Sequence, residues 1–148
     1  MRPDILVRDA GGNAVLAVEV KARRGVDHEW AAQLRRNLSA HGTSVDAGFF
    51  MIVTTDEAFL WRDTDEDRLT VRPPDATIET RDLLGNELVS APTLDGRTLE
   101  LVVAAWLKSI VAEEDITSVR PSVHRFLIAS GLLDALRGST NLVAFEFA

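Results

Sequence analysis

In the stretch DILVRDAGGNAVLAVEVKA, residues 4–22, two apolar segments flank a short polar one. A short apolar run bounded by turn residues is consistent with a β-strand, and paired glycines within a polar segment favour a tight turn. We therefore predict strands over residues 4–8 and 14–22, joined into an antiparallel hairpin by a turn centred on Gly11 and Gly12.

The register of this hairpin determines where its charged residues lie. If Gly11 and Gly12 are the two central turn residues, Asp4 lies opposite Glu19. Directly opposed residues point to the same face of a sheet, and Lys21, two residues beyond Glu19, shares that face. The other face is wholly apolar. The sequence thus predicts two carboxylates and an amine at the open end of the hairpin, and a one-residue change of register would separate them.

Two opposed carboxylates repel each other, which raises the pKa of one of them unless a cation lies between them. Mg²⁺ prefers oxygen ligands and binds through one or two carboxylates, water and phosphate. The three residues at the open end of the hairpin are therefore interpreted as a metal site. A lysine in an apolar strand is itself unusual here, since the chain has fourteen arginines but only two lysines, Lys21 and Lys108. The alternative interpretation is a cross-strand salt-bridge cluster on a solvated face.

The rest of the chain completes an α/β fold with a mixed sheet flanked by helices, in a single domain over residues 1–148. The domain divides into a core (1–54), a loop-rich acidic segment (55–97) and a helical C-terminal part ending in a strand (98–148). Further elements are predicted as follows: a helix over 28–40 capped by Asp27 with Trp30, Leu34, Leu38 and His41 as its buried stripe, a buried strand over 47–54, a helical turn or short strand over 57–61, a short helix near 79–84, helices over 98–112 and 122–136, and a strand over 141–147.

One known motif matches the hairpin. Pro3-Asp4, followed after fourteen residues by Glu19-Val20-Lys21, resembles the signature of the PD-(D/E)xK (restriction-endonuclease-like) nuclease superfamily. The order of hairpin, helix 28–40 and apolar strand 47–54 is similar to the core of that superfamily. Gln33 matches a glutamine found on the same helix in its exonuclease-type branch.

The resemblance implies a metal-dependent phosphodiester hydrolase. Asp4 and Glu19 would bind Mg²⁺ or Mn²⁺, together with the Val20 carbonyl. Lys21 would assist the nucleophilic water, and Gln33 would position the substrate or the metal site. The implied partner is nucleic acid, with DNA expected.

The chain also departs from the superfamily pattern. The family core has a helix, often bearing an acidic residue, and a strand before the Pro-Asp strand, whereas Asp4 lies near the start here. Those elements are missing, supplied by another chain such as a second copy in a homodimer, or replaced by C-terminal elements. Asn37 stands where the exonuclease-type branch tends to have Tyr. The alternative function is therefore a catalytically inactive nuclease-fold module that serves binding or assembly.

Composition narrows the setting. The net charge of −7 argues against a protein that coats nucleic acid, but residues 1–38 hold seven Arg/Lys against five Asp/Glu, so contact with nucleic acid is expected there. The chain has no cysteine, which excludes disulfides and thiolate sites. No apolar run approaches the roughly 20 residues of a membrane span, and no signal peptide is evident. We expect a cytoplasmic protein without a membrane segment.

Overall fold

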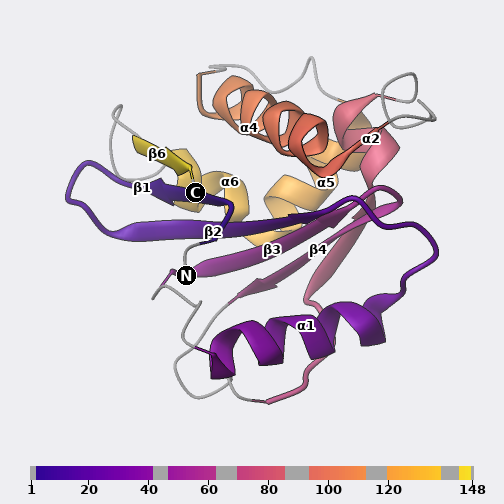
Figure 1. Cartoon of the computed structure of the whole chain (residues 1–148). Helices are drawn as coiled ribbons and strands as arrows, with labels where there is room; N and C mark the ends of the chain where they lie inside the picture. Colours follow the sequence, from indigo (N-terminus) through magenta and orange to yellow (C-terminus); the bar gives the residue numbers. More distant parts are fainter. Residues whose placement is uncertain are drawn as a thin grey trace.

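The computed structural model describes residues 3–41, 47–62, 70–85, 94–112, 120–137 and the backbone of 144–147. A six-stranded sheet has helices on both faces (Figure 1). The elements in chain order are β1 (Ile5–Arg8), β2 (Ala14–Lys21), α1 (His28–Ala40), β3 (Phe49–Thr54), β4 (Glu57–Arg62), β5 (Ala76–Glu79), α2 (Thr80–Leu84), α4 (Gly96–Ala112), α5 (Pro121–Ser130), α6 (Leu132–Arg137) and β6 (Ala144–Phe147).

The sheet is mixed, with strand order β5-β4-β3-β2-β1-β6. Only the central pair β2 and β3 is parallel, and it is joined by α1, as a parallel connection requires. The other four pairs are antiparallel, including the N-terminal hairpin and the pair formed by β1 and β6. The predicted α/β class and antiparallel hairpin are confirmed. The C-terminal strand lies directly beside β1.

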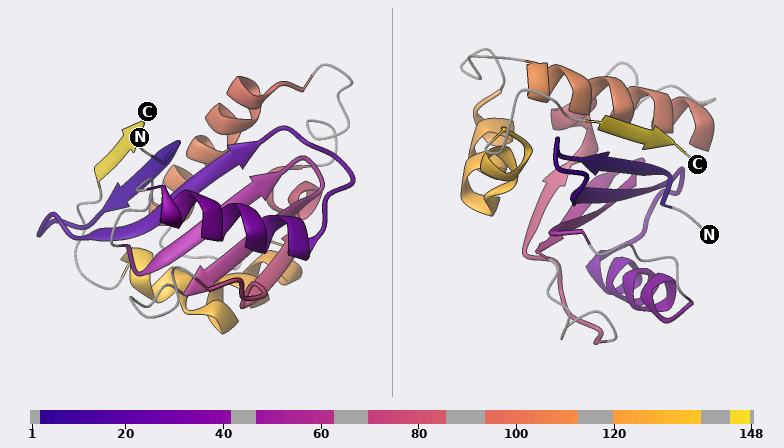
Figure 2. Two further views of the ribbon diagram at one scale, coloured as in Figure 1. Left: turned by 60° about the horizontal axis from the view of Figure 1, so that its bottom comes forward. Right: turned by 90° about the vertical axis from the view of Figure 1, so that its left-hand side faces the viewer.

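Each face of the sheet builds its own hydrophobic core, because successive strand residues point to opposite faces. One core packs α2, α4, α5 and α6 against residues such as Val18 of β2 and Met51 of β3. The other packs α1 against residues such as Ala17 and Ile52. Figure 2 shows α1 and α4 on opposite sides of the sheet. Both faces of β2 and β3 are therefore covered, which explains the continuous apolar run of β3.

The hairpin reaches the predicted register through a different turn. Asp9 O accepts the Gly12 N–H at 3.0 Å, and Gly12 has a φ of 84°, so the turn spans Asp9 to Asn13 instead of centring on two glycines. The longer turn pairs Arg8 with Ala14. An extra residue on β2, Val15, then restores the pairing of Val7 with Leu16.

From that bulge onward the register is the predicted one. Ile5 pairs with Val18, and one further step along the same ladder places Asp4 opposite Glu19. The bulge thus cancels the shift that the longer turn introduces. Without it, Asp4 and Glu19 would point to opposite faces.

Helix α1 has the predicted bounds and cap. The Asp27 Oδ1 atom accepts the Trp30 N–H at 3.0 Å, which satisfies one of the open donors of the first turn. Trp30, Leu34 and Leu38 are partly buried against the core beneath α1, as predicted. His41 is exposed, so its place in the buried stripe was wrong.

Of the two alternatives predicted for residues 57–61, the strand is correct, since these residues belong to β4. The segment predicted as loop-rich contains β5. The helix predicted over 122–136 is two helices, α5 and α6, because Gly131 adopts a left-handed φ of 81° between them. The helix predicted near 79–84 is α2, and the one over 98–112 begins at Gly96.

Within the described residues, no helix is both long and apolar enough to cross a membrane.

Candidate metal and phosphate site

The open end of the hairpin brings Asp4 against β2. The Asp4 Oδ2 atom accepts the backbone N–H of Val20 at 2.7 Å. Asp4 immediately precedes β1, which begins at Ile5. Its carboxylate therefore accepts a β2 backbone N–H that would otherwise bond to the backbone of a longer β1. The predicted proximity of Asp4 to the Glu19-Val20-Lys21 segment is therefore present.

The Val20 N–H points toward the β1 side of β2, because Asp4 Oδ2 accepts it at 2.7 Å. The N–H and C=O groups of one strand residue point to the same side of the strand, so the Val20 carbonyl also lies on the β1 side of β2.

Glu19 is a buried acid, with 5% of its surface exposed. Burial, the negative charge of Asp4 and a hydrogen bond with Asp4 raise the pKa of Glu19 to about 7, while the nearby Lys21 opposes the rise. Near neutral pH Glu19 is therefore poised between its protonated form and a carboxylate that can bind a cation. Glu19 is therefore not part of a salt-bridge cluster on a solvated face.

Lys21 lies next to Glu19 on the same face of β2. Its Nζ atom is 3.7 Å from Glu19 Oε2, and the Lys21 side chain is 40% exposed whereas the Glu19 side chain is 7% exposed. A partly exposed lysine therefore lies beside a buried carboxylate. Asp4, Glu19 and Lys21 meet at one place, as the register predicts.

A third acid, Glu100 of α4, lies close enough to Asp4 for the Asp4 charge to affect its pKa. Asp95 caps α4 by accepting the Thr98 N–H at 2.8 Å, which sets Glu100 in the first turns of the helix. Burial and the charge of Asp4 raise the pKa of Glu100, while Arg97 opposes the rise. Sequence reasoning missed Glu100, because its spacing along α4 shows only a solvated helix position and its approach to Asp4 depends on how α4 packs over the hairpin.

Gln33 lies on α1 with an exposed side chain. In the part of the chain that the structure describes, no hydrogen bond joins Gln33 to Asp4, Glu19 or Lys21. The structure therefore does not bring Gln33 into contact with the other predicted site residues.

The arginines near the site have different environments. Arg23 and Arg24 follow β2 and are exposed, and Arg24 Nη1 lies 3.5 Å from Asp56 Oδ1. Arg36 is exposed on α1. Arg35 is 1% exposed and its guanidinium lies over the Trp61 ring, 5.6 Å from the centroid. Arg35 is a core residue and does not face solvent.

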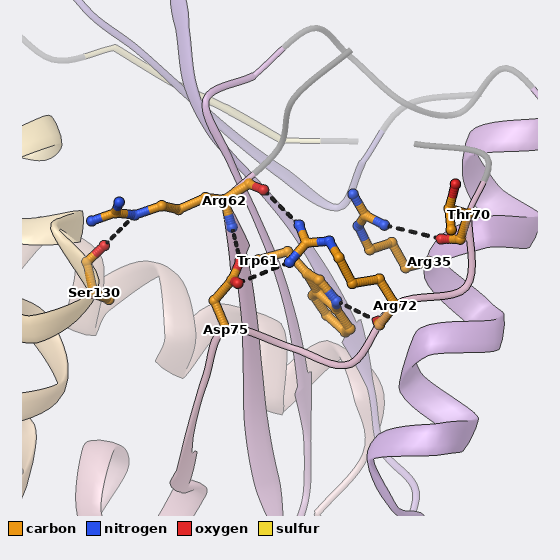
Figure 3. Close-up of polar contacts among 7 residues, drawn as sticks. All are labelled: Arg35, Trp61, Arg62, Thr70, Arg72, Asp75 and Ser130. Atoms are coloured by element: carbon orange, nitrogen blue, oxygen red, sulfur yellow. Dashed lines mark hydrogen bonds and ion pairs between the residues drawn. The ribbon is translucent and has the colours of Figure 1, made fainter. Parts of the chain in front are cut away.

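Figure 3 shows how this buried region is held together at the end of β4. Arg35 Nη1 donates to the Thr70 carbonyl at 3.5 Å, and Trp61 Nε1 donates to the Arg72 carbonyl at 2.9 Å. Arg62 Nε donates to the Ser130 carbonyl at 3.0 Å, at the end of α5. These bonds attach residues 70–75 and α5 to the sheet. The arginines of this region are therefore structural residues.

The donor set at the hairpin suits a hard divalent cation. It offers the carboxylates of Asp4 and Glu19 and the Val20 carbonyl, all oxygen ligands of the kind Mg²⁺ prefers. Among the described residues, no group of three or more His, Cys, Asp or Glu side chains is close enough to hold a metal ion by itself. Mg²⁺ commonly keeps several water ligands, so two carboxylates fit its requirements.

A groove of about 460 Å³ lies elsewhere, between β5 and α5. Its acidic lining residues Asp75, Glu79 and Asp82 each form an ion pair with an arginine. The groove shares no lining residue with the Asp4 and Glu19 site.

No family model, curated protein or solved structure matches this chain.

Proposed function

We propose that Asp4 and Glu19 bind Mg²⁺ or Mn²⁺, and that the protein hydrolyses phosphodiester bonds in nucleic acid. The observation that carries the proposal is the buried Glu19 carboxyl held against Asp4, with its pKa raised to about 7. Burying the Glu19 carboxyl beside a second acid costs free energy, and a bound cation offsets that cost. The oxygen donors and the adjacent ammonium of Lys21 support a metal-dependent hydrolase over a purely structural pair.

Each residue has a defined part in this chemistry. Asp4 and Glu19 hold the cation with the Val20 carbonyl, and the Val20 N–H fixes the Asp4 carboxylate. When bound, the cation supplies positive charge that stabilises a phosphoryl transition state. Lys21 reaches solvent from the side of Glu19 and orients the attacking water by donating a hydrogen bond. Gln33 is given a substrate-positioning part only through the family resemblance.

The topology supports the resemblance to the PD-(D/E)xK superfamily. That core normally has a helix, often bearing an acidic residue, and a strand before the Pro-Asp strand. Here β6 pairs with β1, and α4 carries Glu100 toward Asp4. In this proposal β6 and α4 take the places of that strand and that helix.

The proposed substrate is DNA, approaching the N-terminal third of the chain. Lys21, Arg23 and Arg24 are exposed or partly exposed around the end of β2, in a chain whose net charge is −7. A local group of cations is needed for a polyanion to approach such a protein. In this proposal the protein works in the cytoplasm, where nucleic acid and Mg²⁺ occur together.

A second function is a catalytically inactive nuclease-fold module that binds a protein or nucleic acid, or builds an assembly. One observation favours it: Lys21 already lies 3.7 Å from Glu19, so the buried acid has a cation of its own. In that case the cluster is a stabilising ion pair and needs no metal.

Calorimetric titration with Mg²⁺, repeated with Mn²⁺, separates the two functions. We expect the wild-type protein to bind the cation at neutral pH and to release protons as it does so, because the cation displaces the proton from Glu19, whose pKa is raised to about 7. The Glu19→Gln variant should lose binding, since the amide keeps the size of the side chain but not its charge. A plasmid-cleavage assay on the same preparations then measures turnover.

The matched control is Glu29→Gln, which removes an exposed acid from the first turn of α1. Binding by this variant should equal that of the wild type. Equal heats for the wild type and Glu19→Gln would rule out the metal site and leave the inactive module.

A further inference from the structure

We infer that Arg23, held on the face of Trp30, binds a phosphate group of the DNA backbone beside the Asp4 and Glu19 site. This inference rests on the proposed function and specifies how the substrate is held. It assigns the contact to one of the four arginines at residues 23, 24, 35 and 36.

The backbone of Arg23 is anchored to the end of the sheet that carries the site. The Arg23 N–H donates to the Lys21 carbonyl at 2.7 Å, and the Arg23 carbonyl accepts the Thr55 N–H at 3.2 Å. Lys21 is the last residue of β2, and Thr55 directly follows β3. Arg23 therefore leaves the sheet at a defined position, two residues from Lys21.

The side chain of Arg23 is oriented by an aromatic ring. Its Cζ atom lies 5.4 Å from the centroid of Trp30, within the range of a cation–π contact. Trp30 in turn is partly buried against the core beneath α1. The guanidinium is thus held at the surface with fewer accessible rotamers than a fully solvated arginine has, so less entropy is lost when it binds a ligand.

Arg23 is exposed to solvent. In the described part of the chain, its side-chain contact is the Trp30 ring, and no carboxylate or carbonyl accepts its N–H groups. A guanidinium stacked on a ring keeps its donor edge available for two parallel hydrogen bonds, which match the oxygens of a phosphate.

The other three arginines are engaged differently. Arg24 pairs with Asp56 at 3.5 Å, and Asp56 also accepts the Gly25 N–H at 2.7 Å, so this pair orders the loop that carries Arg23. Arg35 is buried on Trp61. Arg36 lies farther along α1, with Nη1 3.5 Å from Asn37 Oδ1.

The position of Arg23 suits contact with a phosphate of the DNA backbone when the bond to be cleaved lies at the Asp4 and Glu19 carboxylates. A polyanion that approaches two acids is repelled unless cations lie next to them. Lys21 and Arg23 are such cations. Arg23 lies beyond Lys21, so it contacts a neighbouring phosphate and not the one being attacked.

The test measures binding of a short fluorescein-labelled DNA duplex by anisotropy in EDTA, where no cleavage occurs. We compare the wild type, Arg23→Gln and Arg36→Gln between about 50 and 200 mM salt. Arg23→Gln should weaken binding by about tenfold and lower the slope of log K against log salt by about 0.9, the value for one phosphate contact. Arg36→Gln should match the wild type in both quantities.

A second variant tests the part played by Trp30. Trp30→Leu keeps an apolar side chain for the core but removes the ring beneath Arg23. It should weaken binding by a few fold with the salt slope unchanged, since the charge remains. In the double variant that combines Arg23→Gln with Trp30→Leu, the loss of binding affinity should be no greater than that of Arg23→Gln alone. Without the guanidinium, the Trp30 ring has no side chain to orient.

Two results would overturn the inference: no binding of the duplex by the wild type, or equal affinity and salt slope for the wild type and Arg23→Gln. Calorimetry with Mg²⁺ on the same proteins reports separately on Asp4 and Glu19. Intact Mg²⁺ binding without a contribution of Arg23 to DNA binding contradicts this inference alone. Absent Mg²⁺ binding contradicts the proposed function.

Discussion

Replacing Lys21 with alanine should reduce the rate of phosphodiester cleavage by on the order of 10²–10⁴-fold, the contribution of one positioned proton donor or electrostatic group. The Lys21 ammonium lies 3.7 Å from Glu19 and its side chain is partly exposed, so in the proposed mechanism it donates to the attacking water or to a phosphoryl oxygen. The fold should remain, because the Lys21 side chain is 40% exposed. The measurement is plasmid cleavage in Mg²⁺ together with the free energy of unfolding in urea.

Lys108→Ala is the matched control, because Lys21 and Lys108 are the two lysines of the chain and Lys108 is exposed on α4. It should cleave like the wild type. A Lys21→Arg variant separates two parts of the effect, since arginine keeps the charge but does not release its proton. Full activity of Lys21→Ala would refute the assignment of Lys21.

In metal-free buffer at pH 8, Glu19→Gln should be more stable than the wild type, by on the order of 2–3 kcal/mol in the free energy of unfolding. Burial and Asp4 raise the folded-state pKa of Glu19 from 4.5 to about 7. A raised carboxyl pKa contributes stability that is present below the unfolded pKa and is lost as the pH rises through the folded pKa. The wild type therefore loses stability between about pH 4.5 and 7, and the amide variant has no such loss from this group.

Urea unfolding followed by tryptophan fluorescence from pH 4.5 to pH 8 measures the difference. The two proteins should converge toward pH 4.5, where Glu19 carries a proton in the folded state. Mg²⁺ should restore stability to the wild type at pH 8 and have no effect on Glu19→Gln. Glu29→Gln serves again as the control, and a constant difference between wild type and Glu19→Gln across this range would contradict the raised pKa of the buried Glu19 carboxyl.

The hairpin could be predicted from local sequence because its register depends on a short stretch of chain. The proximity of Asp4 to Glu19 was correct, although the turn was not. Paired glycines suggested a two-residue turn, whereas Asp9 and Asn13 close a longer one by hydrogen bonds from the Asn13 N–H to Asp9 Oδ1 and from the Asp9 N–H to the Asn13 carbonyl. The compensating bulge at Val15 depends on which face of β2 packs against each hydrophobic core. The local sequence does not show which face packs against which core.

The features that were missed depend on contacts between distant parts of the chain. Strand β5 has only four residues and follows Pro73 and Pro74, so its local sequence reads as a loop. Glu100 approaches Asp4 because α4 packs over the hairpin. Arg35 carries a full charge but is buried on Trp61, a partner 26 positions away in the printed sequence. Helical spacing places such a residue on a face but does not name its partner.

The helix α1 illustrates the opposite case. Its start depends on Asp27 and the backbone of Trp30, three residues apart, and its apolar spacing is regular. Both signals are local, and the predicted bounds were correct. Its individual contacts were less predictable, because Ala31, Ala32 and Arg35 are more deeply buried than Trp30, Leu34 and Leu38.

Anomalous diffraction from crystals of the protein soaked in Mn²⁺ tests the central claim most directly. The account predicts an anomalous peak within about 2.5 Å of carboxylate oxygens of both Asp4 and Glu19, a generous limit for a hard divalent cation bound to oxygen. It also predicts that the peak is absent from crystals of Glu19→Gln. A soaked crystal with no peak between these two carboxylates, or with one that persists in Glu19→Gln, would contradict it.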